Sequence, residues 1–268
     1  IPAETPYLIH ISHEIHEDNG ALEYGKTTDI SMRIKNVGKQ ATNNVTVTLG
    51  ANSEYVTISK NNVQITTINA NEEINLDKAF TVNINPSIPD ETKIEFTVTC
   101  SNGTDTWTTM FYEYAYAPVF VINRVGMHSN KLAQPGEKSA IEIEFENVGN
   151  AVAYNVVTEA YSSSSDIEFE DISAVTEEVK VGESYVVTLD FNVAQSVLIG
   201  TVFDVICTVN ADFVTESTNY ELKVGLVGDN FETGDFSAHE WKIEGEGVWV
   251  IDSIKPYEGK YCVKSDNV

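Results

Sequence analysis

The stretch "GKTTDISMRIKNVG", from Gly25 to Gly38, decides the fold, because the chain contains it twice. The second copy is "GEKSAIEIEFENVG", from Gly136 to Gly149. In both copies apolar and polar residues alternate, a period of two that places one face of a β-strand on a core and the other in solvent. The apolar positions are Ile30, Met32 and Ile34 in the first copy and Ile141, Ile143 and Phe145 in the second. The two stretches predict a duplicated β domain.

The repeat extends well beyond this strand. Phe80 aligns with Phe191 at the same offset. After a shift of four residues, "FTVTC" (Phe96 to Cys100) aligns with "FDVIC" (Phe203 to Cys207). The cysteines that end these two runs are in phase with inward Phe and Val residues, so we expect them at equivalent, buried positions, where a thiol behaves as a small apolar group.

Turn-forming segments such as "NPSIPD" (Asn85 to Asp90) separate the predicted strands, and no segment of ten or more residues keeps a helical period. About seven strands in about 110 residues are typical of an immunoglobulin-like sandwich. We therefore expect an all-β chain with two tandem immunoglobulin-like β-sandwiches, residues 1–117 and 118–227. Residues 228–268 follow with a different, glycine-rich and aromatic pattern.

Composition limits the possible partners. The chain has 16 Lys and Arg against 41 Asp and Glu, a formal net charge of −25. Such a chain repels phosphate backbones and anionic lipid heads, so we expect no nucleic-acid partner. It contains no apolar run of about 18 residues, and no membrane span is expected. Three cysteines do not make a disulfide scaffold, and export stays open. Because the chain starts at Ile1 rather than Met, we interpret it as a piece of a longer protein.

Both copies end in Asn-Val-Gly, which has a backbone explanation. We expect Gly38 and Gly149 to adopt a positive φ in the turn to the next strand. We expect the side chains of Asn36 and Asn147 to satisfy backbone groups of that turn. The motif needs no ligand to explain it.

An alternating strand, then "NVG", then the pattern A-x-N-V-x-V resembles the CARDB-type bacterial immunoglobulin-like module. Residues 21–49 and 131–160 carry the resemblance. It implies tandem spacer modules of exported bacterial proteins.

The third segment resembles the opening strands of the jelly-roll domains called cleaved adhesin domains, which occur with gingipain-like secreted cysteine peptidases. The resemblance rests on "FETGDF" (Phe231 to Phe236), Trp241, "WVID" (Trp249 to Asp252) and "YEGKYCVKS" (Tyr257 to Ser265). A jelly roll needs about eight strands, and forty residues supply about three, so we expect an incomplete jelly-roll domain. The resemblance implies a peptidase domain upstream of this chain.

The same resemblance implies a calcium ion near the first strand of the jelly roll. The matching residues are Asp229 and Glu232, with Asp235 nearby, and carboxylate oxygens are the ligands that Ca²⁺ prefers. The alternative is a solvated acidic turn. Other cofactors are not expected.

The histidines of "HISHEIH" invite a zinc interpretation. On a regular strand, however, His10 and His16 share one face while His13 points to the other, which favours a solvated edge strand. Cys262, like the other two cysteines, has no His close in sequence, so we expect no thiol nucleophile and no catalytic residue in this chain.

We therefore expect a non-catalytic accessory or spacer region of an exported protein on the bacterial surface, with its upstream peptidase domain and the rest of the jelly roll as partners. An adhesin-type module that binds host protein or glycan is the alternative, with Trp241 and Trp249 either stacking on sugar rings or forming jelly-roll core. An enzyme in its own right is the third hypothesis, against which stands the lack of a recognisable catalytic motif.

Overall fold

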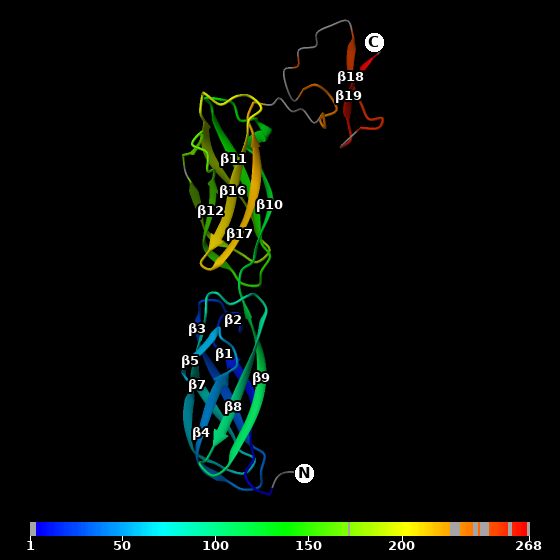
Figure 1. Cartoon of the computed structure of the whole chain (residues 1–268). Helices are drawn as coiled ribbons and strands as arrows, with labels where there is room; N and C mark the ends of the chain where they lie inside the picture. The colour runs from blue at the N-terminus through cyan, green and yellow to red at the C-terminus, as the bar shows by residue number, and fades with distance from the viewer. Residues whose placement is uncertain are drawn as a thin grey trace.

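The computed structural model describes residues 4–170, 172–225, 231–237, 241, 247–256 and 259–266. Over these residues the chain is all-β apart from one 3-10 turn, η1 (His128–Asn130). Two immunoglobulin-like β-sandwiches follow one another along the chain and lie end to end, joined by a single connection (Figure 1).

The first sandwich consists of two sheets packed face to face, one with the strand order β1-β3-β7-β5 and the other with the order β2-β9-β8-β4-β6. Neighbouring strands are antiparallel, except for the short parallel pair of β2 and β9. The inward residues of both sheets form its core, in which Phe80 and Phe96 are fully buried. The strands are β1 (Leu8–Ile15), β2 (Leu22–Glu23), β3 (Thr27–Asn36), β4 (Thr42–Ala51), β5 (Val56–Lys60), β6 (Asn62–Ile68), β7 (Glu73–Ile84), β8 (Thr92–Ser101) and β9 (Thr106–Tyr116).

The second sandwich repeats this arrangement, with sheets β10-β11-β15-β13 and β14-β12-β16-β17. A parallel bridge between Ala133 and Val224 stands where β2 pairs with β9 in the first sandwich. Phe145 and Phe191 are fully buried in its own core. The strands are β10 (Phe120–Met127), β11 (Lys138–Asn147), β12 (Ala153–Tyr161), β13 (Ile167–Phe169), β14 (Ser173–Val179), β15 (Ser184–Val193), β16 (Val202–Ala211) and β17 (Val214–Lys223).

The described residues of the third segment contain one antiparallel pair, β18 (Val248–Asp252) and β19 (Cys262–Asp266). Its aromatic residues Phe231, Phe236 and Trp241 pack on one another, with ring centroids 5.6–6.4 Å apart. Among the described residues of the chain, no helix is long and apolar enough to cross a membrane.

Strand register corrects one expectation about the repeat. Cys100 lies opposite Val47 of β4, whereas Cys207 lies opposite Ala160 of β12. At the offset of the repeated stretch, the equivalent of Val47 is Thr158, whose partner is Val209. Cys207 therefore occupies the position of Val98, and the prediction that the two cysteines are equivalent is wrong. Between the repeated stretch and β16, the second sandwich is therefore two residues shorter than the first, and not four as the alignment of the cysteines predicts.

The Asn-Val-Gly motif is confirmed for its asparagines and corrected for its glycines. Asn36 is fully buried; its Oδ1 accepts from the backbone N–H of Tyr7 and Gly38, and its Nδ2 donates to the carbonyls of Gln40 and Ile68. Neither glycine of the motif has a positive φ. A Cβ on Gly38 would instead lie less than 3.0 Å from the backbone of residues 5–7. The glycine is needed because another backbone approaches it.

Candidate functional site: the joint between the sandwiches

The second copy of the motif clamps the connection between the sandwiches. Asn147 Oδ1 accepts from the N–H of Val119 at 3.2 Å and of Gly149 at 3.1 Å. Its Nδ2 donates to the carbonyls of Ala151 and Val179. Since Asn147 is fully buried, these bonds are shielded from water and hold the connection against the start of the second sandwich.

Gly149 brings the same connection into close contact. A Cβ at this position would lie less than 3.0 Å from Ala117, Pro118 and Val119. Backbone bonds run alongside, from Val148 N–H to the Val119 carbonyl at 2.8 Å and from Asn150 N–H to the Ala117 carbonyl at 3.1 Å. The three connecting residues are thus fixed along their whole length.

Asp90, at the end of the first sandwich, bonds to both sides of the connection. One carboxylate oxygen accepts from the N–H of Ala117 at 2.9 Å, and the other accepts from the side-chain amide of Asn150 at 2.8 Å. The same amide also lies 3.3 Å from the carboxylate of Glu91. Glu91 has a φ of 56°, in the left-handed region, which turns the chain back toward β8.

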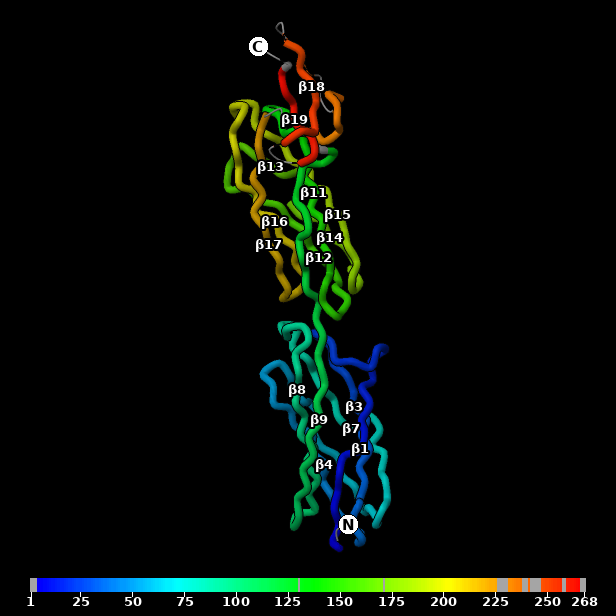
Figure 2. Tube along the Cα trace, turned by 90° about the vertical axis from the view of Figure 1, so that its right-hand side faces the viewer, coloured from blue at the N-terminus to red at the C-terminus, as the bar shows by residue number. Residues whose placement is uncertain are grey.

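The cores also meet at the joint. Ala151 belongs to the second sandwich by sequence, yet it is 2% exposed and packs in the hydrophobic core of the first. Beside it, the Tyr24 hydroxyl donates to the carbonyl of Val152 at 3.1 Å. Burial of this hydroxyl, with the charge of Asp212 next in importance, raises the pKa of Tyr24 and keeps it a donor. Figures 1 and 2 show the sandwiches in line through this joint.

The structure places the histidines differently from the prediction. A β-bulge between His10 and Ser12 puts His10 opposite Ile34 and His13 opposite Met32, and both partners face the core. His10 and His13 therefore lie on one face, with His13 Nδ1 3.2 Å from His10 Nε2. The prediction that His10 shares its face with His16 is wrong, because a regular strand was assumed.

These two rings lie between the sheets. Both stack on Phe111 of β9, with centroids 4.8 Å away for His10 and 4.0 Å for His13. His13 Nε2 is 2.6 Å from Glu113 Oε1. Burial, and then the charge of His13, lowers the pKa of His10 to about 4. His16 lies apart and bonds to Ser31.

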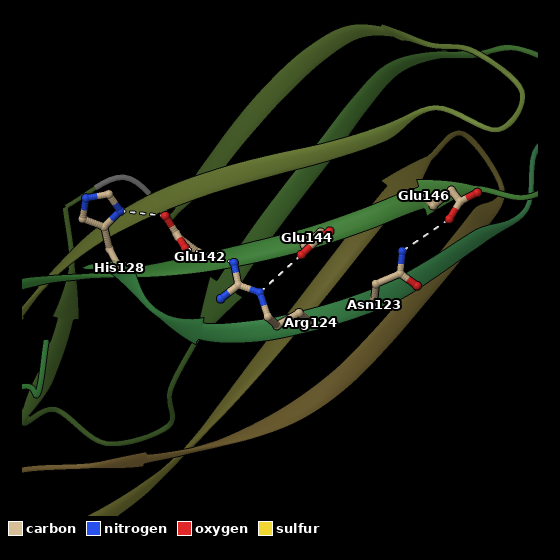
Figure 3. Close-up of polar contacts among 6 residues, drawn as sticks. All are labelled: Asn123, Arg124, His128, Glu142, Glu144 and Glu146. Carbon is tan, nitrogen blue, oxygen red and sulfur yellow. Dashed lines mark hydrogen bonds and ion pairs between the residues drawn. The ribbon is translucent and has the colours of Figure 1, made fainter. Parts of the chain in front are cut away.

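An acidic row on β11, formed by Glu142, Glu144 and Glu146, bonds to side chains of β10 and of η1 (Figure 3). Arg124 bonds to Glu142 and Glu144, each at 3.2 Å, and His128 Nδ1 lies 2.7 Å from Glu142. Bonds from His128 and Arg124 lower the pKa of Glu142. About half of the Arg124 and His128 side chains is exposed, so these contacts form a solvated network on the surface, where water screens the charges and the pairs contribute little to stability.

The calcium candidates are only partly described. Asp229 lies outside the described residues. Glu232 Oε1 accepts from the N–H of Lys260 at 2.7 Å and of Tyr261 at 3.1 Å, which ties the first turn to the approach to β19. Asp235 accepts from the N–H and hydroxyl of Ser237, bonds that lower its pKa. Within the described residues, no group of three or more His, Cys, Asp or Glu is placed to hold a metal.

The thiols of the two sandwiches are deeply buried. Cys100 is 2% and Cys207 0% exposed, and burial raises the pKa of each to about 12. A thiol that stays protonated at neutral pH is a poor nucleophile. Cys262 is half-buried on β19.

Large exposed residues, a methionine and two tyrosines, gather on the outer face of β9. Met110, Tyr112 and Tyr114 are 57%, 48% and 46% exposed, and the ammonium of Lys93 lies 3.9 Å from the centre of the Tyr112 ring. Strand register aligns them with Asn219, Glu221 and Lys223 of β17. The second sandwich thus has no apolar residue at these three positions, and the fold does not require the stripe. Alternation in the sequence predicts that Tyr112 and Tyr114 share one face of this strand, and the comparison with β17 singles them out.

No family model matches the chain, and no curated protein matches it. Solved structures are similar at a low level, among them the following three. Red sea bream transglutaminase has a TM-score of 0.32 and 12% identity over 82% of this chain and 31% of its own. The native Escherichia coli alpha-2-macroglobulin has a TM-score of 0.32 and 9% identity over 82% of this chain and 16% of its own. The I67–I69 fragment of titin has a TM-score of 0.31 and 11% identity over 83% of this chain and 66% of its own. The chain spans less than a third of the length of the first two proteins.

Proposed function

We propose that this chain is a non-catalytic spacer region of an exported protein of the bacterial surface, placed C-terminal to a gingipain-like cysteine peptidase domain. In this role the sandwiches hold the peptidase and the rest of the jelly roll at a set distance and orientation. The resemblance of residues 21–49, 131–160 and 231–265 to the respective families supports the setting.

The joint is the observation that carries this proposal. A flexible tether needs neither a buried asparagine on the connection nor an alanine of one domain in the core of the other. Domains in one chain move relative to each other by default. The contacts of Asn147, Gly149, Ala151 and Asp90 restrict that motion, as a spacer of fixed length requires.

The non-catalytic part of the proposal has a direct test. The chain is incubated with a peptide library, with and without a thiol-alkylating reagent. We expect no turnover, because Cys100 and Cys207 are buried and the sequence lacks a recognisable catalytic motif. Turnover that alkylation abolishes would make the chain an enzyme and overturn the proposal.

The alternative, an adhesin-type module, is favoured by the stripe of Met110, Tyr112 and Tyr114. Tyrosine offers a flat apolar ring and a polar tip at low entropic cost, which suits recognition of sugars or protein surfaces. A glycan array compares the native chain with Tyr112→Ala and with Tyr161→Ala, a control that removes an exposed tyrosine, 61% exposed, from the second sandwich. Binding lost only in the first variant would favour the adhesin.

We extend the proposal to a calcium ion bound by Asp229, Glu232 and Asp235, as the resemblance implies. Loading such a site stabilises the folded segment by mass action. The melting temperature is compared in calcium and in EDTA, with the Asp235→Asn variant as control. An unchanged melting temperature in the native chain would remove calcium from the proposal.

A further inference from the structure

The two histidines and Glu113 occupy an open side of the first sandwich. β1 is the outermost strand of its sheet, and β9 is bordered by β2 only at Ala115 and Tyr116. The side chains of His13 and Glu113 are 17% and 30% exposed, so their contact closes the space between the two strands while both groups stay accessible to solvent protons. We call His10, His13 and Glu113 the histidine cluster.

The second sandwich shows that the fold does not need this cluster. Register places Ile122 at the position of His10 and Val125 at that of His13, with the same bulge between Ile122 and Arg124. Leu222 stands where the first sandwich has Glu113, and it is fully buried. Apolar residues therefore close the same seam in the duplicate, and apolar replacement of buried ionic groups is often neutral or stabilising.

The cluster depends on an unprotonated nitrogen. His13 Nδ1 and His10 Nε2 are 3.2 Å apart, so one of them must accept the proton that the other donates. When both rings are fully protonated, two N–H groups and two positive charges face each other. Glu113 contacts His13, so its negative charge offsets chiefly that ring.

The strands packed against the histidines offer little negative charge that could offset their protonation. The residues of β3 opposite the histidines, Ile34 and Met32, are apolar and fully buried. Phe96 of β8 stacks on Phe111 behind the rings. The charged groups beside the cluster lie on outer faces: Arg33 is ion-paired with Glu73, and Glu14 is exposed.

We infer that the histidine cluster is an acid-sensitive latch between β1 and β9, closed while His10 is neutral and released when His10 takes up a proton. The low pKa of His10, about 4 against an ordinary 6.5, agrees with this geometry. The folded chain takes up this proton at a lower pH than the unfolded chain does. The stability that neutral His10 allows is therefore fully present above pH 6.5 and falls as the pH drops from 6.5 to 4.

The test compares the native chain with the triple variant His10→Ile, His13→Val, Glu113→Leu, which installs the residues of the second sandwich. Amide hydrogen exchange is measured between pH 7 and 4 and corrected for the intrinsic exchange rate. In the native chain, we expect the opening equilibrium of β1 to rise by about tenfold on acidification, since one unit of pKa is a factor of ten and partial exposure reduces the full shift. The variant should lose this rise. The control His128→Gln, an exposed histidine in an ion pair, should keep it.

A second measurement needs no variant. An NMR titration of the His10 ring should give a pKa near 4. A value near 6.5, or the same acid response in the native chain and the triple variant, would overturn the latch.

Discussion

The side-chain amide of Asn150 donates to the carboxylate of Asp90 across the joint at 2.8 Å, while the other oxygen of Asp90 binds the N–H of Ala117 in the connection. One residue of the first sandwich thus holds both the connection and the second sandwich. The double variant Asp90→Ala, Asn150→Ala should loosen the joint without unfolding either core, because Asn150 is exposed and Asp90 only half-buried. NMR relaxation of backbone amides should show the sandwiches tumbling together in the native chain and more independently in the variant. Asn123→Ala, which removes an exposed bond to Glu146, serves as control and should leave tumbling unchanged.

The two glycines of the motif make a matched pair. Gly149→Ala forces a Cβ against the backbone of residues 117–119, and we expect a loss of about 2 kcal/mol together with a disturbed joint. Gly38→Ala makes the same clash against residues 5–7, so it should cost a similar amount and leave the joint intact. Denaturant unfolding gives the free energies, and amide shifts of residues 117–119 report on the joint. If both variants disturb those shifts equally, the clash does not act locally.

A buried hydroxyl in the second sandwich offers a stabilising change. Among the described residues, Thr158 is the one whose buried side-chain oxygen has no hydrogen-bond partner, and its equivalent in the first sandwich is Val47. Thr158→Val keeps the shape of the side chain and removes an unsatisfied group, so we expect a gain of about 1 kcal/mol in the free energy of unfolding. Thr208→Val, at a half-buried site on β16, should change it by less than about 0.5 kcal/mol. A loss of stability in Thr158→Val would mean that the hydroxyl is satisfied in solution.

The cysteines should differ in reactivity. With pKa values of about 12, Cys100 and Cys207 carry almost no thiolate at pH 8, and they are shielded from reagents. A disulfide reagent should label Cys262 rapidly in the native chain and all three thiols in denaturant. Rapid native labelling of Cys100 or Cys207 would show that its sandwich opens readily.

Alternation along the chain was enough to predict the strands, because inward residues such as Ile30, Ile141 and Phe145 fall at every second position. The asparagine of the motif was also predictable, since its side chain serves the turn next to it in sequence. The role of Gly149 could not be predicted from the sequence, because the backbone that approaches it lies some thirty residues earlier in the chain.

The candidate sites were harder to predict for the same reason. The shared face of His10 and His13 depends on a single bulged residue, which alternation does not reveal. The link from Asp90 to Asn150 joins two turns sixty residues apart, and both residues are ordinary turn formers. Comparing the two repeats position by position supplies part of this information, because it marks residues such as Glu113 and Tyr112 that the fold itself does not require.

A measurement of how stiff the joint is tests most directly whether the two sandwiches form a spacer of fixed length. Spin labels are placed at Asn62→Cys in the first sandwich and Glu177→Cys in the second, both exposed, in a chain carrying Cys262→Ser. Cys100 and Cys207 stay unlabelled because they are buried. Pulsed electron paramagnetic resonance then measures the distance distribution between the labels. A single narrow distribution that broadens in Asp90→Ala, Asn150→Ala is the predicted result. A broad distribution already present in the native chain would contradict the proposal that the sandwiches form a spacer of fixed length.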